Sequence, residues 1–165
     1  NIAEELRCLV CQNESLAGSR ADLAEDLRRE VRGLIKQGKT DQAAKLFAAV
    51  ADDSGAPQPF RDLARIRDIA MRFDSMPVDQ VVTALKPLAV PGNAWFGSAG
   101  EMLGFAYIKQ GHPELAGPLF ASIARDKEAP DSLRRRARQL AGQLGVDAID
   151  DVKDALAEGA NGPAQ

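Results

Sequence analysis

The sequence predicts an all-α protein in which an N-terminal helical hairpin is followed by a short array of stacked helix pairs. Three observations favour this fold class. The chain is rich in Ala, Leu and Arg and holds only one Trp, one Tyr and six Phe, a composition that favours helices over sheets. Apolar residues recur every three or four positions, and none of the chain alternates with period two for long enough to indicate a strand. One long segment also occurs twice.

The first clear helix begins after Ser19, which with Asp22 has the spacing of a capping box. It ends at Gly38, a typical C-terminal residue. Its apolar positions recur at helical spacing: Leu23, Leu27, Val31, Leu34 and Ile35. The next helix begins at Thr40 or Asp41 and ends before the loop 53–57.

Five further helices follow, separated by breaks rich in Pro and Gly. Their predicted ranges are 60–73, 77–85, 98–110, 113–125 and 131–144. We therefore predict three parts, a helical hairpin over 1–37, the array over 38–145, and a short helix with a flexible tail over 146–165.

The internal repeat is the strongest indication of architecture. The segment IKQGKTDQAAKLFAAVADDSGAP begins at Ile35 and matches IKQGHPELAGPLFASIARDKEAP, which begins at Ile108, a shift of 73 residues. This shift is roughly twice the ~34-residue unit of tetratricopeptide arrays. A weaker unit over 77–110 fits between the two copies. The array is therefore predicted to be a tetratricopeptide-like α-solenoid of about three helix pairs.

Cys8 and Cys11 are the only cysteines, and they lie in the run LRCLVCQN. A disulfide between them would close a loop too short to add much stability. Zinc normally needs four ligands, and beyond this pair only the distant His112 is available. Covalent haem attachment needs a His directly after the second Cys, where this chain has Gln12. Thiol–disulfide exchange, with Arg7 as a nearby cation, and two buried inert thiols are the remaining interpretations.

The segment LRCLVCQNESLAGSRADLAEDLRREVRGLIKQGKTD resembles the cytochrome c maturation protein H (CcmH) family, whose signature is LRCxxCQN followed by a helix with a DLR step. The resemblance covers about the first 40 residues. It implies a periplasmic, membrane-anchored thiol oxidoreductase that keeps the haem-attachment cysteines of apocytochrome c reduced. It also implies that Cys8 and Cys11 are the redox pair, with Arg7, Gln12 and Asn13 beside them in contact with substrate.

Residues 35–144 resemble a different family, the tetratricopeptide-like periplasmic domain of YfgM-type proteins. The segments that carry this resemblance are LFAAVADDSGAP, RDLARIRD, VPGNAWFGSA and LFASIARDKEAP. Such domains are non-catalytic adaptors associated with the Sec translocon and periplasmic chaperones. Two interpretations stay open, one natural protein in which a helix serves both modules, and a mosaic of two proteins.

Other candidate binding residues lie in the array. Arg134, Arg135 and Arg138 belong to a basic cluster that can receive an acidic peptide or a C-terminal carboxylate, although such a cluster is more often a solvated face. Trp95 follows a Pro-Gly-Asn turn and can anchor a partner, although a plug between helix pairs is the more common role.

Composition limits the remaining classes of function. The net charge of −3 and the pI near 5.2 argue against a general nucleic-acid binder. No apolar run approaches the ~20 residues of a membrane-spanning helix. Because the chain begins at Asn1 without Met or a leader, we expect a trimmed or mature segment from which a membrane anchor was removed.

The leading hypothesis is thus a periplasmic thiol–disulfide oxidoreductase or chaperone of cytochrome c maturation. It is expected to use no metal and no cofactor of its own, since haem enters only with the substrate. Its partners would be apocytochrome c and other maturation components. The alternative is a non-catalytic adaptor of the YfgM type, whose partners would be the Sec translocon or periplasmic chaperones.

Overall fold

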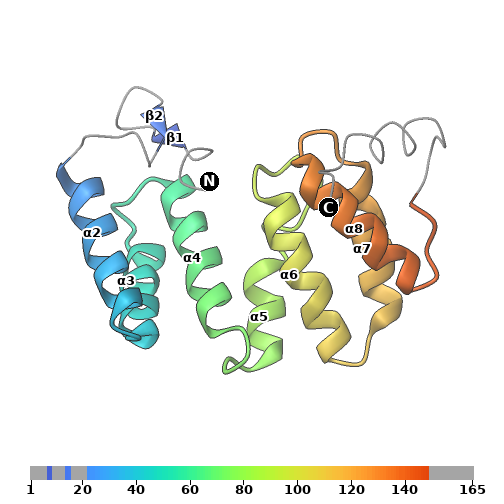
Figure 1. The fold of residues 1–165 in the computed structure, drawn as a ribbon, viewed down its shortest axis with the longest axis horizontal. Helices are drawn as coiled ribbons and strands as arrows, with labels where there is room; N and C mark the ends of the chain where they lie inside the picture. Colours follow the sequence, from blue (N-terminus) through green and yellow to red (C-terminus); the bar gives the residue numbers. More distant parts are fainter. Residues whose placement is uncertain (1–6, 9–13, 16–21, 149–165) are drawn as a thin grey trace.

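The computed structural model describes residues 7–8, 14–15 and 22–148, with side chains described from Arg29 onward. Within these residues the fold is helical, as predicted, except for one pair of two-residue strands (Figure 1). The elements are β1 (Arg7–Cys8), β2 (Glu14–Ser15), α2 (Asp22–Lys36), α3 (Thr40–Asp52), α4 (Gln58–Arg72), α5 (Val78–Leu85), α6 (Phe96–Lys109), α7 (Pro113–Arg125) and α8 (Asp131–Gln143). The predicted C-terminal tail lies outside the described residues after Ala148.

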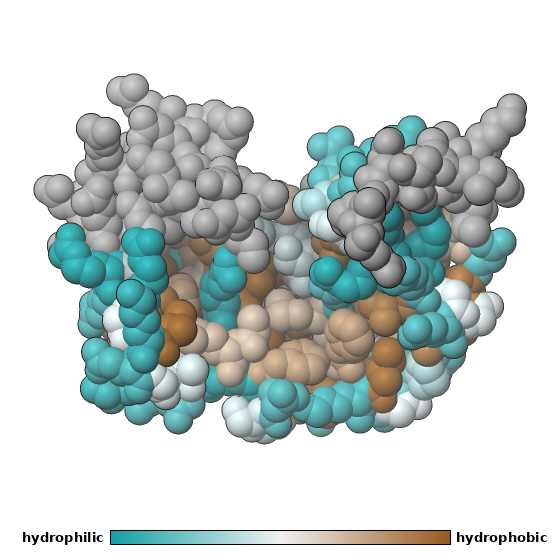
Figure 2. All heavy atoms as spheres, viewed as in Figure 1, coloured by the Kyte–Doolittle hydropathy of each residue, from teal (hydrophilic) through white to brown (hydrophobic). Residues whose placement is uncertain are grey.

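The helices form a row in which each packs mainly on its neighbours in sequence. Helices α2, α4, α6 and α8 begin at the upper end of the molecule in Figure 1, and α3, α5 and α7 run back toward that end. Figure 2 shows hydrophobic residues over the middle of this face and hydrophilic residues along its lower edge. The arrangement is solenoid-like, and its assignment as a tetratricopeptide array stays a prediction.

The sequence repeat is also a repeat of structure. A shift of 73 residues carries α3 (Thr40–Asp52) onto α7 (Pro113–Arg125) without any change of bounds. The turns before these helices use equivalent glycines in the left-handed region, Gly38 with φ 69° and Gly111 with φ 82°. Equivalent loops follow both helices, because Asp53 Oδ1 accepts the Gly55 N–H and Asp126 Oδ1 accepts the Glu128 N–H. The unit α2–α3–α4 therefore corresponds to α6–α7–α8.

Two apolar clusters form the core. One lies among α4, α5 and α6 and includes Ile69, Val81 and Leu85. The other lies mainly between α7 and α8 and is centred on Phe120, whose side chain is fully buried. Tyr107 and Leu119 pack against both clusters, so α4–α8 share a continuous apolar interior.

The two units differ in how closely their first helix approaches their second. A Cβ atom on Gly104 of α6 would lie 2.6 Å from Cε1 of Phe120, so only glycine allows this contact. The equivalent residue of α2 is Val31, and the equivalent of Phe120 is Phe47. Phe47 is only half-buried, and no described side chain from Arg29 to Lys36 is fully buried. Helix α2 is thus packed less tightly on α3 than α6 is on α7.

Replacement of Gly104 with Ala is expected to destabilise the protein by about 1–3 kcal/mol, because the added methyl group overpacks the site against Phe120. Gly142→Ala is the matched control, since a Cβ at Gly142 has no neighbour within 4 Å. That change should be neutral or stabilise by up to about 1 kcal/mol. Urea unfolding followed by circular dichroism measures both, and equal effects of the two changes would contradict the packing described.

Candidate functional site

The segment that carries the two cysteines folds back on itself. Strands β1 and β2 are antiparallel, with Arg7 opposite Ser15 and Cys8 opposite Glu14. Cys11, Gln12 and Asn13 lie within the connection between the strands and outside the described residues, as do the side chains of Arg7 and Cys8. The strands were not predicted, because two residues are too few to give a period-two pattern. Cys8 is therefore placed by backbone pairing rather than by a helix.

The strand pair lies at the end of the array at which α2 and α4 begin (Figure 1). The first N–H groups of a helix carry a partial positive charge that favours anions, including a thiolate. The strand pair thus lies at the end of the array where two helices have their N-termini.

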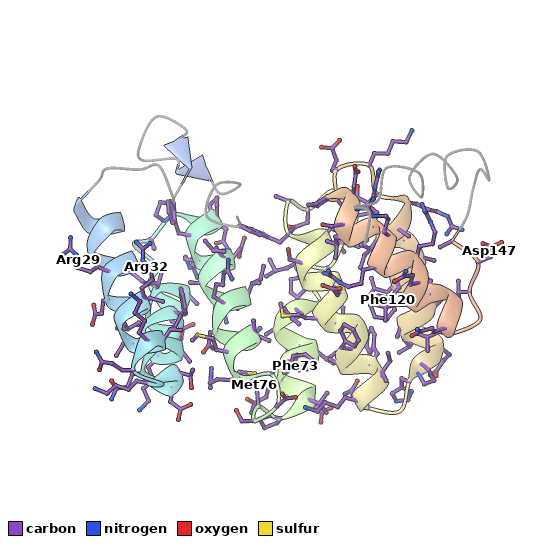
Figure 3. The ribbon with its side chains drawn as sticks, in the orientation of Figure 1. Arg29, Arg32, Phe73, Met76, Phe120 and Asp147 are labelled. Atoms are coloured by element: carbon purple, nitrogen blue, oxygen red, sulfur yellow. The ribbon has the colours of Figure 1, made fainter. Side chains whose placement is uncertain are left out.

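Helix α2 links the cysteine-bearing segment to the array. Val31 and Leu34 are half-buried, whereas Arg29 and Glu30 are exposed. Figure 3 shows Arg29 on the outer side of α2 and Arg32 on the side toward α4. The residues of α6 that pack against α5 are Ala99, Leu103 and Ala106, and their equivalents in α2 are Asp26, Glu30 and Gly33. Glu30 is exposed at a position where α6 has the buried Leu103, as is typical of a helix that caps a repeat array.

The basic cluster on α8 already contains ion pairs. Arg134 donates to Asp131 Oδ1 at 2.6 Å, and Arg136 donates to both carboxylate oxygens of Glu101, at 2.7 Å for Oε2. The hydrogen bonds that Arg136 donates to Glu101 raise the pKa of Arg136. Arg135 and Arg138 are half-buried on the same helix and also have interactions within the chain.

The repeat suggests why arginines stand at positions 134 and 138. Their equivalents Arg61 and Arg65 both donate to the carbonyl oxygen of Ala51, at 3.3 and 3.2 Å. This carbonyl belongs to the last turn of α3, where basic side chains satisfy free acceptors and the helix dipole. The arginine pair in α4 therefore stabilises a helix end, and recognition of an acidic peptide by Arg134, Arg135 and Arg138 stays a prediction.

Trp95 precedes α6 and is half-buried against the cluster of α4, α5 and α6. Its N–H donates to Asn93 Oδ1 at 2.8 Å, which fixes the turn before the helix. The indole thus packs against the helices of this cluster, and its role as an anchor for a partner stays a prediction.

A cavity of about 250 Å³ lies near Trp95, between the start of α6 and the loop that joins α7 to α8. Its lining includes Ser98, Asp126, Glu128 and Leu133. The sequence did not reveal it, because its walls are far apart in the chain. The cavity is lined by two carboxylates, those of Asp126 and Glu128. The Asp126 carboxylate already accepts a hydrogen bond from the backbone N–H of Glu128 within the loop.

The described part of the chain has neither a cluster of metal-ligating side chains nor a helix that could span a membrane. There, no three or more His, Cys, Asp or Glu side chains are grouped so that they would hold a metal ion. Over the same residues, each helix is too short or too polar to cross a bilayer.

Comparison with known proteins identifies the N-terminal region. Residues 1–50 match the family model CcmH, described as cytochrome C biogenesis protein. The cytochrome c-type biogenesis protein CcmH of Pseudomonas aeruginosa is 49% identical over 41 residues, which are 25% of this chain and 26% of that protein. The bifunctional subunit NrfFG of the formate-dependent nitrite reductase complex of Haemophilus influenzae is 37% identical over 62 residues, 36% of this chain and 16% of that protein. No solved structure matches the chain.

The predicted resemblance to the CcmH family is therefore confirmed for the N-terminal region. The match includes both cysteines, all of α2 and most of α3. The aligned part spans about a quarter or less of the length of these relatives. The YfgM-type resemblance of the array stays a prediction.

Replacement of Trp95 with Ala is expected to lower the free energy of unfolding by about 2–4 kcal/mol, because truncation of a packed aromatic side chain leaves a cavity. Trp95→Phe should cost less than about 1.5 kcal/mol. Urea unfolding curves measure both changes. Unchanged stability of the Ala variant would contradict the role of Trp95 as a plug and would favour its role as a partner anchor.

Proposed function

We propose that this chain acts in cytochrome c maturation as a thiol–disulfide oxidoreductase that uses Cys8 and Cys11. The observation that carries the proposal is the match of residues 1–50 to the CcmH family model, because this match spans both cysteines and their neighbours Arg7, Gln12 and Asn13. The proposed substrate is a disulfide between the haem-attachment cysteines of apocytochrome c. Haem then enters only through the substrate.

The proposed reaction is two thiol–disulfide exchanges. The thiolate of one cysteine attacks a sulfur of the substrate disulfide, which forms a mixed disulfide and releases one substrate thiolate. The second cysteine, as a thiolate, attacks the protein sulfur of this mixed disulfide and releases the other substrate thiolate. The substrate has gained two electrons and takes up two protons, and the protein is left with a Cys8–Cys11 disulfide. A reduced dithiol protein must then reduce this disulfide before the next cycle.

The geometry of the described residues supports this chemistry in two ways. The first is that the antiparallel pairing of Cys8 with Glu14 brings together the two ends of the segment that contains Cys11. The second is that β1 and β2 lie at the end of the array where α2 and α4 begin, and the N-terminus of a helix favours a thiolate that lies close to it.

The proposed location is the periplasm, on a protein anchored in the inner membrane, and the proposed partners are other components of cytochrome c maturation. In this proposal the helices α3–α8 hold a partner polypeptide while the cysteines react. The rival proposal is a non-catalytic adaptor, and its support is the size of the array, which makes up most of the described residues.

A thiol-exchange assay separates the two proposals. The reduced protein is mixed with an oxidised CxxCH peptide, and the peptide thiols released are measured by mass spectrometry after acid quenching. Wild type should reduce the peptide and become oxidised in equal amounts, because each turnover transfers two electrons. Cys8→Ser and Cys11→Ser are tested separately. The variant that lacks the resolving cysteine should accumulate a stable mixed disulfide with the peptide. Loss of the attacking cysteine should abolish the reaction.

The reduction potential of the Cys8–Cys11 pair, measured against a glutathione buffer, completes the test. A protein that exchanges no disulfide with the peptide, and whose thiols resist a small alkylating reagent in the native state, would refute the oxidoreductase proposal and leave the adaptor.

A further inference from the structure

Arg67 differs from the other arginines of α4 in its lack of a partner. Arg61 and Arg65 donate to the carbonyl oxygen of Ala51, and Arg72 donates to Asp68, at 2.7 Å for Nε to Oδ1. Arg67 is half-buried, yet it makes no hydrogen bond or ion pair within the described part of the chain. Burial lowers the pKa of its guanidinium, but not enough to remove the charge.

The side of α4 that carries Arg67 is distinct from the sides that face α3 and the cluster with α5 and α6. Arg61 and Arg65 face α3 through their bonds to Ala51, and Ile66 and Ile69 belong to the core cluster with α5 and α6. At 3.6 residues per turn, Arg67 falls on the remaining side of the helix. Leu63 and Met71 lie one turn before and one turn after it on this side, and both are half-buried.

The fold itself does not require a charge at this position. The residue of the second unit equivalent to Arg67 is Leu140, which packs against the cluster around Phe120. An apolar side chain therefore suits this place in the repeat. A half-buried cation without a partner loses hydration and gains no counter-charge, so it destabilises the free protein.

A second position of the first unit shows the same kind of change. Phe105 of α6 stacks edge-on against Phe120, with 5.6 Å between ring centroids, and its equivalent in α2 is Arg32. Arg32 lies on the side of α2 toward α4 (Figure 3). The surface around Phe47 therefore has arginine at two positions where the surface around Phe120 is apolar. Arg32 has an interaction of its own, and the inference rests on Arg67.

We propose that Arg67, flanked by Leu63 and Met71, is a docking site for an extended polypeptide segment that carries an Asp or Glu side chain between apolar residues. A carboxylate matches the fork of donors on a guanidinium. One unpaired cation between apolar side chains suits one carboxylate in an apolar segment. A nucleic acid would need several unpaired cations, and the other arginines of α4 are already engaged. The site requires no redox step, so it can fail or succeed independently of Cys8 and Cys11.

The test uses a fluorescein-labelled peptide of alternating Glu and Leu, and the same peptide with Gln in place of Glu. Fluorescence anisotropy measures the binding of both to the full chain. The protein should bind the Glu peptide more tightly than the Gln peptide. Arg67→Gln should weaken binding of the Glu peptide about tenfold, the effect of losing one charge-assisted hydrogen bond. The matched control is Lys45→Gln, which removes the same charge from an exposed position of α3 and should change the affinity less than about twofold.

A further variant checks the fold. Arg67→Leu introduces the residue found at the equivalent position and should be at least as stable as wild type in urea, while losing the preference for the Glu peptide. Equal binding of the Glu and Gln peptides, no binding of either, or equal losses in Arg67→Gln and Lys45→Gln would overturn the proposal. Arg67-dependent binding to phosphatidylglycerol vesicles without binding of the Glu peptide would also overturn it, in favour of a membrane surface.

Discussion

The packing of α2 against α3 is the contact on which the rest of the molecule depends, because it joins the cysteine-bearing segment to the helical array. At this contact, Val31 and Leu34 are half-buried on α2, and Ala43 and Ala44 are buried on α3. The equivalent contact between α6 and α7 is tighter, since Gly104 lets the Phe120 ring approach the backbone. The chain thus attaches its cysteine-bearing segment through the less tightly packed of the two equivalent helix contacts.

The same comparison shows that α2 fits as a terminal helix. Where α6 packs small and apolar residues against α5, α2 has Asp26, Glu30 and Gly33, which suit contact with solvent. The family match over residues 1–50 covers α2 and extends into α3. Helix α2 can therefore belong both to the family segment and to the helical array. Whether the two parts form one natural protein or a mosaic stays open.

Much of this architecture could be predicted from the sequence, because a helix shows its apolar periodicity and its end residues within one short stretch of the chain. The range 113–125 agrees with α7, and other helix ends differ from the structure mostly by one or two residues, where caps and last turns vary. The sequence repeat aligns Gly38 with Gly111, and both glycines adopt the left-handed conformation in equivalent turns. The strands at Cys8 and Glu14 could not be predicted, since two paired residues carry no periodicity. The lack of a partner for Arg67 could not be predicted either, because it depends on which acidic side chains the fold brings close to α4.

The central claim is that α2 is both the end of the CcmH-like segment and a structural helix of the array. Native-state hydrogen exchange of the amides of α2 tests it most directly, with α3 and α4 as the reference. The account predicts that α2 amides are protected and lose their protection together with those of α3 when urea is added, as members of one cooperative unit. Exchange of α2 at the rate of an unstructured peptide, while α3 and α4 stay protected, would contradict it.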